Sequence, residues 1–485
     1  MTIQKREKER LIRELTKELQ EENLAIFAGA GLSIPAGFVN WKELLKPIAD
    51  DLNLDIEKEA SDLISLAQYH YNANQSNRSK LNQLLIANFC KKEANPTINH
   101  RILARLPVSI YWTTNYDNLI ESSLKEAGKI PDVKYTNQQL AFTKPRRDVV
   151  VYKMHGDVEH PDKAILTKDD YERYHLDMQP FLNALSGDLV SKTFLFIGFS
   201  FSDPNLDYIL SRVRIHYQKN QRQHFCLLRK VDRNECEDNA DFEYKERKQD
   251  FFVQDLLRFG VRSVLVDEYK EITEILENLE KQYRRNTIFV SGAAHDYSPH
   301  TQDESCQFVF NLTKSIIEDG YNIVSGFGLG IGSSVITGAL EHIYMSGGNI
   351  RNGQLVLRPF PQTQTGATKD LKQIWRDYRN DMLSFSGIAI FVFGNKQTDT
   401  DELILSNGMR EEFEIAKSKG LFLLPIGATG YIAKELWNEV NENFEEYNGA
   451  VSSEIKEKFS LLGKEKLTFE EMYEHVMHIL MLLKT

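Results

Sequence analysis

Residues 24–33 read LAIFAGAGLS, a short apolar run that ends abruptly in glycine and small polar residues. A continuous apolar run of this length is typical of a buried strand in a parallel sheet. Glycine at the end of such a strand lets the backbone turn tightly and approach a phosphate closely. The stretch predicts a strand followed by a loop of the nucleotide-binding type, although glycine turns after strands are also common without a nucleotide.

The same pattern returns three times within the next 170 residues. Apolar runs at 108–112, 149–153 and 193–197 lead into TTNYD, MHGD and GFS, and helical patterns follow them. Strands that alternate with helices predict a parallel sheet covered on both faces. Loops at the carboxyl ends of such strands share one edge, where ligands bind. Each segment alone reads as a turn, but the four together predict a site.

A second series of strands follows a charged junction at residues 281–286. Its apolar runs lie at 287–290, 322–324, 355–357, 388–393 and 421–425. The run at 322–324 leads into the glycine-rich stretch SGFGLGIGS. Two domains are natural for 485 residues. We expect an α/β protein with two Rossmann-like parallel-sheet domains, residues 1–284 and residues 285–485.

The composition excludes several classes of protein. A net charge of −11 argues against nucleic acid as the main partner, and no apolar run is long enough to span a membrane. The four cysteines form no CxxC pair, so we expect no zinc, no other metal and no disulfide framework. Without an apolar signal core near residue 1, the expected location is the cytoplasm.

Asn115 and His155 are the strongest candidates for chemistry at the expected edge of the first sheet. Histidine has an unperturbed pKa of about 6.5 and can therefore transfer protons at physiological pH. Either residue can also serve local turn bonding at a strand end. Beside a glycine loop of the NAD-binding type, the two residues together favour catalysis.

The four segments, in this order, resemble the signature of the sirtuin family over roughly residues 20–270. The resemblance implies that His155 is the catalytic histidine and that Asn115 and Asp117 line the nicotinamide–ribose side of NAD. It places Ser200 near the adenosine ribose. The NAD-binding residues that it implies are Ala28, Gly29, Ala30, Gly31, Ser33, Asp117, Gly198 and Ser200.

The chain departs from protein-deacetylating sirtuins in two respects. Their zinc module of two cysteine pairs is missing, and their Gly-Ile-Pro-Asp-Phe-Arg loop is replaced by GFVNW at residues 37–41. Hydrolysis needs only water, whereas a deacetylase needs a groove for an acyl-lysine peptide. At the cation-like ribosyl centre, Asn115 can orient water while His155 manages a ribose hydroxyl proton. We therefore expect an NAD+ glycohydrolase that releases nicotinamide and ADP-ribose.

The glycine-rich stretch of the second half opens a helix, which favours phosphate binding, although a plain packing turn has the same glycines. Arg358, Arg379 and Lys396 lie near strand ends and can neutralise phosphates. This half resembles the SLOG and lysine-decarboxylase-like Rossmannoid group. That group's catalytic PGGxGTxxE motif is not intact here, because NGMREEF at 407–413 keeps only a glutamate. A binding domain is therefore favoured over a second hydrolase.

A sirtuin-like half followed by a SLOG-like half closely resembles the effector NADases of the bacterial Thoeris anti-phage system. The resemblance implies activation by a cyclic ADP-ribose isomer from a partner TIR-domain protein, depletion of NAD in antiviral defence, and a homotetramer. It implies no cofactor beyond NAD as substrate. Glu411 is a one-residue alternative to Glu412 among the signal-binding residues. Those residues are Ser291, Gly292, Gly326, Gly328, Gly330, Gly332, Arg379, Lys396 and Glu412.

Two alternatives stay open at this point. The first is a sirtuin-type NAD-dependent protein deacylase, which the missing cysteine pairs and the altered loop at residues 37–41 oppose. The second is a non-catalytic nucleotide sensor, which the intact pair Asn115 and His155 opposes. NAD is expected over NADP, but no acidic residue is assigned to the 2′-hydroxyl.

Overall fold

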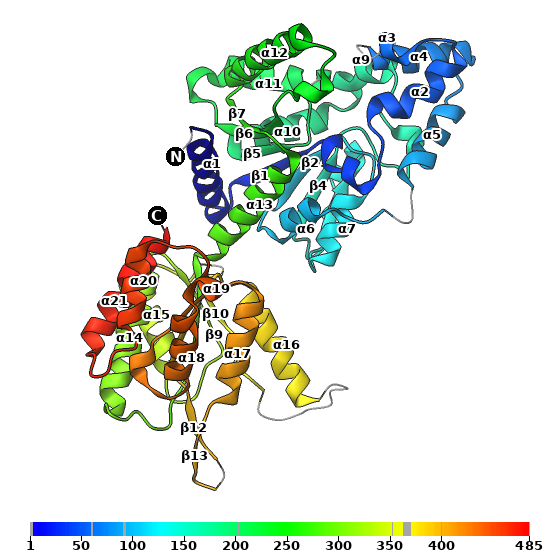
Figure 1. Ribbon diagram of the computed structural model, residues 1–485. Coiled ribbons are helices and arrows are strands. Elements are labelled where there is room, and N and C mark those ends of the chain that lie inside the picture. The colour runs from blue at the N-terminus through cyan, green and yellow to red at the C-terminus, as the bar shows by residue number, and fades with distance from the viewer. Residues whose placement is uncertain are drawn as a thin grey trace. The chain divides into compact units, whose positions relative to one another are not determined.

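The computed structural model describes residues 3–59, 62–90, 94–201, 203–351, 353–361, 370–398 and 400–484. The chain divides into two compact units, Met1–Glu280 and Lys281–Thr485. Each unit is built on a parallel sheet with helices on both faces (Figure 1), which confirms the expected α/β class. Among the described residues, no helix is long and apolar enough to cross a membrane.

The first unit contains a seven-stranded sheet in the order β3-β4-β2-β1-β5-β6-β7. Its strands are β1 (Leu24–Ala28), β2 (Ile110–Thr113), β3 (Pro131–Lys134), β4 (Val149–Lys153), β5 (Thr193–Ile197), β6 (His224–Arg229) and β7 (Val261–Val266). All neighbouring strands pair in parallel. The strand order reverses at β1, which lies between β2 and β5. The loops after β1 and β5 therefore meet at a topological switch point.

Helices cover this sheet, and four of them form a layer of their own. The helices are α1 (Ile3–Gln20), α2 (Trp41–Asp51), α3 (Ile56–Glu59), α4 (Leu63–Ala73), α5 (Ser79–Phe89), α6 (Ile98–Arg105), α7 (Leu119–Glu126), α8 (Asn137–Leu140), α9 (Lys168–Asp177), α10 (Gln179–Ser191), α11 (Pro204–Tyr217), α12 (Asn239–Arg258) and α13 (Tyr269–Arg284). Apolar side chains of α2–α5 share a core with Tyr116 and Val158. This helical layer therefore packs directly on the loops that follow β2 and β4.

The second unit contains a five-stranded parallel sheet in the order β10-β9-β8-β11-β14, and a two-stranded antiparallel hairpin. The sheet strands are β8 (Thr287–Ala293), β9 (Asn322–Ser325), β10 (Leu355–Leu357), β11 (Ile388–Phe393) and β14 (Phe422–Pro425). The hairpin strands are β12 (Asn395–Gln397) and β13 (Leu403–Leu405). The strand order again reverses at the first strand of the unit, β8, so this sheet has its own switch point.

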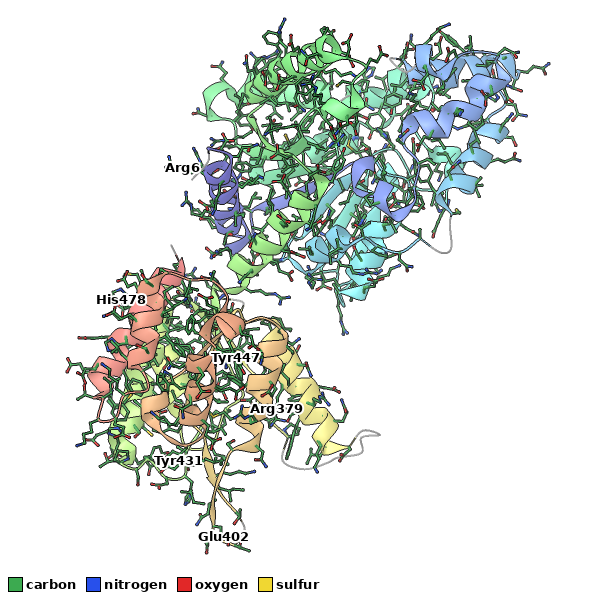
Figure 2. The ribbon with its side chains drawn as sticks, in the orientation of Figure 1. Arg6, Arg379, Glu402, Tyr431, Tyr447 and His478 are labelled. Carbon is green, nitrogen blue, oxygen red and sulfur yellow. The ribbon has the colours of Figure 1, made fainter. Side chains whose placement is uncertain are left out.

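Helices enclose the second sheet around one large apolar core that includes the strand β11, which is buried along its whole length. The helices are α14 (Gln302–Glu318), α15 (Gly332–Met345), α16 (Leu371–Ser384), α17 (Asn407–Ser418), α18 (Tyr431–Glu442), α19 (Phe444–Asn448), α20 (Ser453–Leu461) and α21 (Phe469–Lys484). The hairpin β12–β13 extends away from this body, and Glu402 lies at its far end (Figure 2).

Candidate active site

A cavity of about 770 Å³ opens at the carboxyl ends of the strands of the first unit. Segments far apart in sequence line it, namely 30–35 after β1, 114–117 after β2, His155 after β4, and 198–200 after β5. Residues 38–42 and Tyr171 of α9 add aromatic walls. The volume lies in the range of small-molecule and cofactor sites. The four segments expected to meet at one edge of the sheet do meet there.

The loops after β1 and β5 pack so closely that no side chain fits between them. Gly31 N–H donates to Gly198 O at 2.9 Å, and Gly29 N–H donates to Ile197 O at 3.0 Å. A Cβ atom on Gly29 would lie 2.4 Å from Gly198 O. Gly198 has a φ of +63°, and a Cβ there would lie 2.3 Å from Leu32 N. The packing of the two loops therefore requires these glycines, whether or not a ligand is bound.

Several amides of the loop after β1 are already hydrogen-bonded within the protein. Leu32 N–H donates to Gly29 O at 3.0 Å, and Ser33 N–H donates to Ala30 O at 2.9 Å. These bonds form the short 3₁₀ turn at Ala30–Leu32. The amides of Leu32 and Ser33 are therefore not free to bind a phosphate in this arrangement. The groups that the loop can offer to a ligand are its surface and the Ser33 hydroxyl.

Asn115 is buried at the end of β2 and held in one orientation. Its Nδ2 group donates to Gly29 O and to Ser33 Oγ, each at 3.1 Å, and its backbone N–H donates to Thr113 Oγ1 at 3.0 Å. Because both Nδ2 hydrogens are used, the side chain can offer only its oxygen Oδ1 to a water or a hydroxyl. Asn115 lines the cavity, so Oδ1 is positioned for such a contact.

His155 lies in the cavity wall with only 3% of its surface exposed. Its Nε2 atom lies 2.7 Å from Asp203 Oδ2. This is a charge contact, because neither ring nitrogen makes a well-aligned hydrogen bond among the described residues. The rings of Tyr171 and Tyr116 flank the imidazole, with centroid separations of 5.5 and 6.4 Å. The ring therefore has a fixed environment. Both of its nitrogens are buried, and Nε2 is the one that faces the Asp203 carboxylate.

Asp203 connects this histidine to the start of a helix. Its Oδ1 accepts hydrogen bonds from the backbone amides of Asn205 and Leu206, at 2.9 and 3.0 Å, as the N-cap of α11. Burial acts to raise the pKa of Asp203, but the His155 charge and the two amides outweigh burial and hold that pKa below its ordinary value. The carboxylate therefore stays ionised beside the imidazole.

A buried lysine fixes the loop that follows β2. Lys153 Nζ lies 3.1 Å from Glu121 Oε1 and 2.5 Å from Asp157 Oδ2, and it donates to the carbonyl oxygens of Tyr116 and Asp117 at 3.1 and 2.6 Å. Burial acts to lower the pKa of Lys153, but the two carboxylates raise it above its ordinary value. The ammonium group thus connects the loop after β2 with the loop after β4.

Asp117 is one of the two residues whose carbonyl oxygen accepts a hydrogen bond from that ammonium group. Its Oδ1 accepts a hydrogen bond from Leu119 N–H at 3.0 Å, while Oδ2 has no hydrogen-bond partner among the described residues. Burial raises the pKa of Asp117, and the Lys153 charge opposes that increase. An unpaired carboxylate oxygen in the cavity wall can accept a hydrogen bond from a ligand hydroxyl.

Both catalytic candidates and six of the eight expected NAD-binding residues line the cavity. Those six are Ala30, Gly31, Ser33, Asp117, Gly198 and Ser200. Ala28 and Gly29 lie behind the cavity wall, where Ala28 O accepts a hydrogen bond from Thr113 Oγ1 at 2.9 Å. Sequence reasoning did not single out Asp203, Tyr171 or Lys153. For Lys153 the available signal was a charged residue at an expected strand end.

In the second unit, three of the expected signal-binding residues lie together between β8, α16 and α17. Ser291 Oγ donates to Glu412 Oε2 at 2.5 Å, and Arg379 Nε lies 3.5 Å from Glu412 Oε1. Arg379 Nη1 also donates to Glu411 Oε2 at 2.7 Å, and its guanidinium lies 4.9 Å from the Phe360 ring centroid (Figure 2). Burial raises the pKa of Glu412, against the effects of Ser291 and Arg379. Glu411 and Glu412, the two alternatives for one signal-binding position, therefore both contact Arg379.

The glycine-rich loop after β9 is crowded against β8 and its surroundings. A Cβ on Gly328 would lie 1.9 Å from Gly292 O, and Gly330 has a φ of +83°. A Cβ on Gly326 or Gly332 would lie 2.7 or 2.8 Å from its nearest neighbour. Lys396 is exposed on the hairpin strand β12 and is not one of the ion-pair partners of Glu411 and Glu412 among the described residues. The four glycines of the loop after β9 therefore have a packing role, whether or not they bind a ligand.

No group of three or more metal-ligating side chains occurs in the described part of the chain. The described cysteines are all free.

Comparison with known proteins identifies both halves. A model of the SIR2-like domain matches residues 109–251, and a model of the Sir2- and TIR-associating SLOG family matches residues 271–483. The chain is 51% identical over 475 residues to the NAD(+) hydrolase ThsA of Bacillus cereus (strain MSX-D12), which covers 98% of each chain. The chain belongs to the ThsA family of NAD(+) hydrolases. The sirtuin-like and SLOG-like halves expected from the motifs are confirmed.

Other relatives agree with this membership. The ThsA of Acinetobacter baumannii (strain 532279) is 50% identical over 460 residues, which cover 94% of this chain and 95% of that one. The protein named Defense-associated sirtuin 2 of Bacillus subtilis is 28% identical over 210 residues, or 42% of this chain and 20% of that one. Similarity to the ThsA proteins thus spans both units, whereas similarity to Defense-associated sirtuin 2 covers only part of the chain.

Proposed function

We propose that the first unit hydrolyses NAD+ at the nicotinamide–ribose bond, giving nicotinamide and ADP-ribose. The observation that carries this proposal is the cavity in which Asn115 and His155 lie at neighbouring strand ends beside the loops after β1 and β5. Membership of a family of NAD(+) hydrolases supports the same activity. Incubation of the protein with NAD+, followed by chromatography of the products, tests it directly.

The two polar residues have different tasks in this reaction. As nicotinamide leaves, C1′ of the ribose acquires positive character, and water attacks it. Asn115 Oδ1 orients that water, because its Nδ2 group is held by Gly29 and Ser33. His155 takes the proton of a ribose hydroxyl at its unpaired nitrogen Nδ1. Asp117, Ser33 and the 198–200 loop hold the rest of the dinucleotide.

Substitution of the two residues separates binding from chemistry. His155→Ala removes a general acid/base and should lower kcat by about 10²–10⁴-fold. Asn115→Ala should lower kcat by about 10²–10³-fold, with normal thermal melting in both variants. Turnover near the wild-type value in either variant would remove that residue from the mechanism. Release of a deacetylated peptide from an acetyl-lysine substrate would instead favour the deacylase.

The second unit supports a separate proposal, that it binds a cyclic ADP-ribose isomer made by a TIR-domain partner and so activates the first unit. The Arg379 cluster carries it, because a guanidinium between two glutamates can exchange Glu411 for a phosphate. The glycine loop after β9 and Lys396 of the hairpin complete the proposed site. A signal that binds the active arrangement more tightly than the resting one shifts the population towards activity.

Titration of NADase activity with cyclic ADP-ribose isomers tests this regulation. Arg379→Ala and Lys396→Ala should each raise the activating concentration and leave the maximal rate unchanged. Arg376→Ala, an exposed arginine one turn earlier on α16, is the matched control and should respond as wild type does. Wild-type activation in both test variants would show that the signal binds elsewhere.

Three further properties belong to the same proposal. The protein works in the cytoplasm, assembles as a homotetramer, and depletes cellular NAD during antiviral defence. Sedimentation analysis of the purified chain measures the oligomeric state, and NAD assays on infected cells measure the depletion. Catalytic efficiencies on NAD and NADP, compared side by side, decide whether the site discriminates at the 2′ position.

A further inference from the structure

Asp203 is a single carboxylate with two separate sets of contacts. Its Oδ1 caps α11 through the backbone amides of Asn205 and Leu206. Its Oδ2 lies 2.7 Å from His155 Nε2, and the Asp203 side chain is only 7% exposed. An aspartate that served only as a helix cap would need one oxygen, and Ser, Thr or Asn would cap equally well. The second contact therefore needs its own explanation.

We propose that Asp203 is the positioning residue of His155. It fixes the imidazole ring, and its charge, 2.7 Å from Nε2, favours the tautomer with the proton on that nitrogen, which leaves Nδ1 as the base. This inference rests on the proposed NAD+ hydrolysis, because it assigns a partner to the histidine of that reaction.

The surroundings of the ring leave this task to Asp203. Tyr116 and Tyr171 contact the imidazole through their rings, at centroid separations of 6.4 and 5.5 Å. The Tyr116 hydroxyl donates to Ile165 O at 2.6 Å and is therefore committed elsewhere. Among the ion pairs of the described residues, Asp203 is the one charged partner of His155. It is also anchored, since two backbone amides of α11 fix the orientation of its carboxylate.

The proton balance of the step is simple. Nδ1 of His155 takes the proton of a ribose hydroxyl, and the ring becomes an imidazolium with a proton on each nitrogen. Asp203 stays ionised and stabilises that charge; no proton moves onto the carboxylate. As the water oxygen bonds to C1′ and the bond to nicotinamide breaks, the water gives a proton to the ribose oxygen. Nδ1 then releases its own proton to solvent, which accounts for the one H+ that hydrolysis of NAD+ produces. An anchored carboxylate that holds the catalytic tautomer of a histidine in this way is known to matter by large factors in kcat.

Asp203→Asn in the full-length chain is the decisive variant. Asparagine caps helices as well as aspartate does, so Oδ1 can still accept from Asn205 and Leu206. Its Nδ2 group would face Nε2 and donate to it, which favours the opposite tautomer. We expect kcat for nicotinamide release to fall by about 10²–10⁴-fold while KM for NAD+ stays within about twofold of wild type. Asp203→Ser, which also caps but cannot reach His155, should behave alike.

Asp238→Asn is the matched control. Asp238 is the N-cap of α12, where its side chain accepts from Asp241 N at 2.7 Å. This variant should keep the wild-type kcat, which shows that replacing a capping aspartate by asparagine does not itself inactivate the unit.

The outcomes separate this inference from the proposed function. If the wild-type chain releases no nicotinamide from NAD+, the proposed function is wrong. If wild type is active and Asp203→Asn has a kcat within threefold of it, or loses efficiency only through KM, the positioning role is wrong. If Asp203→Asn and Asp203→Ser both melt well below wild type, Asp203 is a structural residue and the inference is also overturned.

Discussion

The side-chain nitrogen Nδ2 of Asn115 lies 3.1 Å from the hydroxyl oxygen of Ser33. Ser33 follows the 3₁₀ turn Ala30–Leu32 in the loop after β1, and Asn115 follows β2, so this hydrogen bond connects the loops of two neighbouring strands. Together with the bond from Nδ2 to Gly29 O, it decides which end of the Asn115 amide is presented to the cavity. Under the proposed mechanism, we therefore expect Ser33 to influence the reaction through Asn115.

Ser33→Ala should lower kcat for nicotinamide release by about 10-fold, because the amide of Asn115 loses one of its two anchors. Asn115→Ala, which removes Oδ1 itself, should lower kcat by about 10²–10³-fold. Ser191→Ala removes an exposed hydroxyl of α10 and is the control. Steady-state kinetics on all three variants measure the order of effects, and a larger loss in Ser33→Ala than in Asn115→Ala would contradict this account.

Gly198→Ala should both destabilise the first unit and inactivate it. The added Cβ would lie 2.3 Å from Leu32 N, and the backbone there has a φ of +63°. The loops after β1 and β5 would have to separate, which distorts the cavity. Gly187→Ala is the control, since a Cβ on that helical glycine meets open space and should be neutral or stabilising by about 0.5–1 kcal/mol. Thermal melting and NADase assays measure both effects.

Lys153→Met should destabilise the first unit by about 3–5 kcal/mol, because Glu121 and Asp157 would remain as buried carboxylates without a counter-charge. Adding Glu121→Gln and Asp157→Asn should recover much of that stability. Activity should not return with stability, since Tyr116 O and Asp117 O lose their donor in either case. Denaturant unfolding compared with nicotinamide release distinguishes the two losses.

His100 predicts a pH dependence of stability. Burial lowers the pKa of His100 to about 4, from an ordinary value of 6.5. Between these values the unfolded chain binds a proton that the folded chain does not, so stability present above pH 6.5 is lost as the pH falls. Lowering the pH from 7 to 5 should therefore reduce the free energy of unfolding by roughly 2 kcal/mol through this group, since a shift of one pKa unit corresponds to about 1.4 kcal/mol.

His100→Gln isolates that contribution. His100 accepts a hydrogen bond from Thr97 N–H in the capping box of α6, and glutamine suits the same position without titrating. Denaturant unfolding at pH 7 and pH 5 should therefore show a smaller loss in the variant than in wild type. Equal losses in the two proteins would show that His100 does not titrate as proposed.

Most of the sheet positions were predictable from sequence, because buried parallel strands are continuous apolar runs. Strands β4, β5, β10 and β11 have the bounds that the apolar runs indicated. Strand β3 was missed, because its sequence PDVK contains two charged residues. Asp132 and Lys134 lie 2.8 Å apart and are both buried, and only the folded chain shows that these charges compensate each other. The hairpin strands β12 and β13 have three residues each, too few for a periodic signal.

The site was predictable to the extent that its residues follow strand ends. Asn115 and His155 were found because each directly follows an apolar run. Asp203 lies six residues beyond the end of β5, at the start of a helix, where aspartate reads as an ordinary cap. Its second contact, with His155, depends on how the loops after β4 and β5 approach each other. No local sequence pattern predicts how close these two loops lie to each other.

The position of β1 between β2 and β5 also bears on synthesis at the ribosome. The strand β1 is translated long before its neighbour β5, and His155 before its partner Asp203. The cavity wall is therefore complete only after both β5 and Asp203 have been synthesised. From residue 29 to residue 203, translation at about 5–20 residues per second takes on the order of ten seconds or more. Throughout that time the nascent chain carries an incomplete pocket. Under the proposed mechanism, the chain therefore cannot hydrolyse NAD+ until its first unit is largely synthesised.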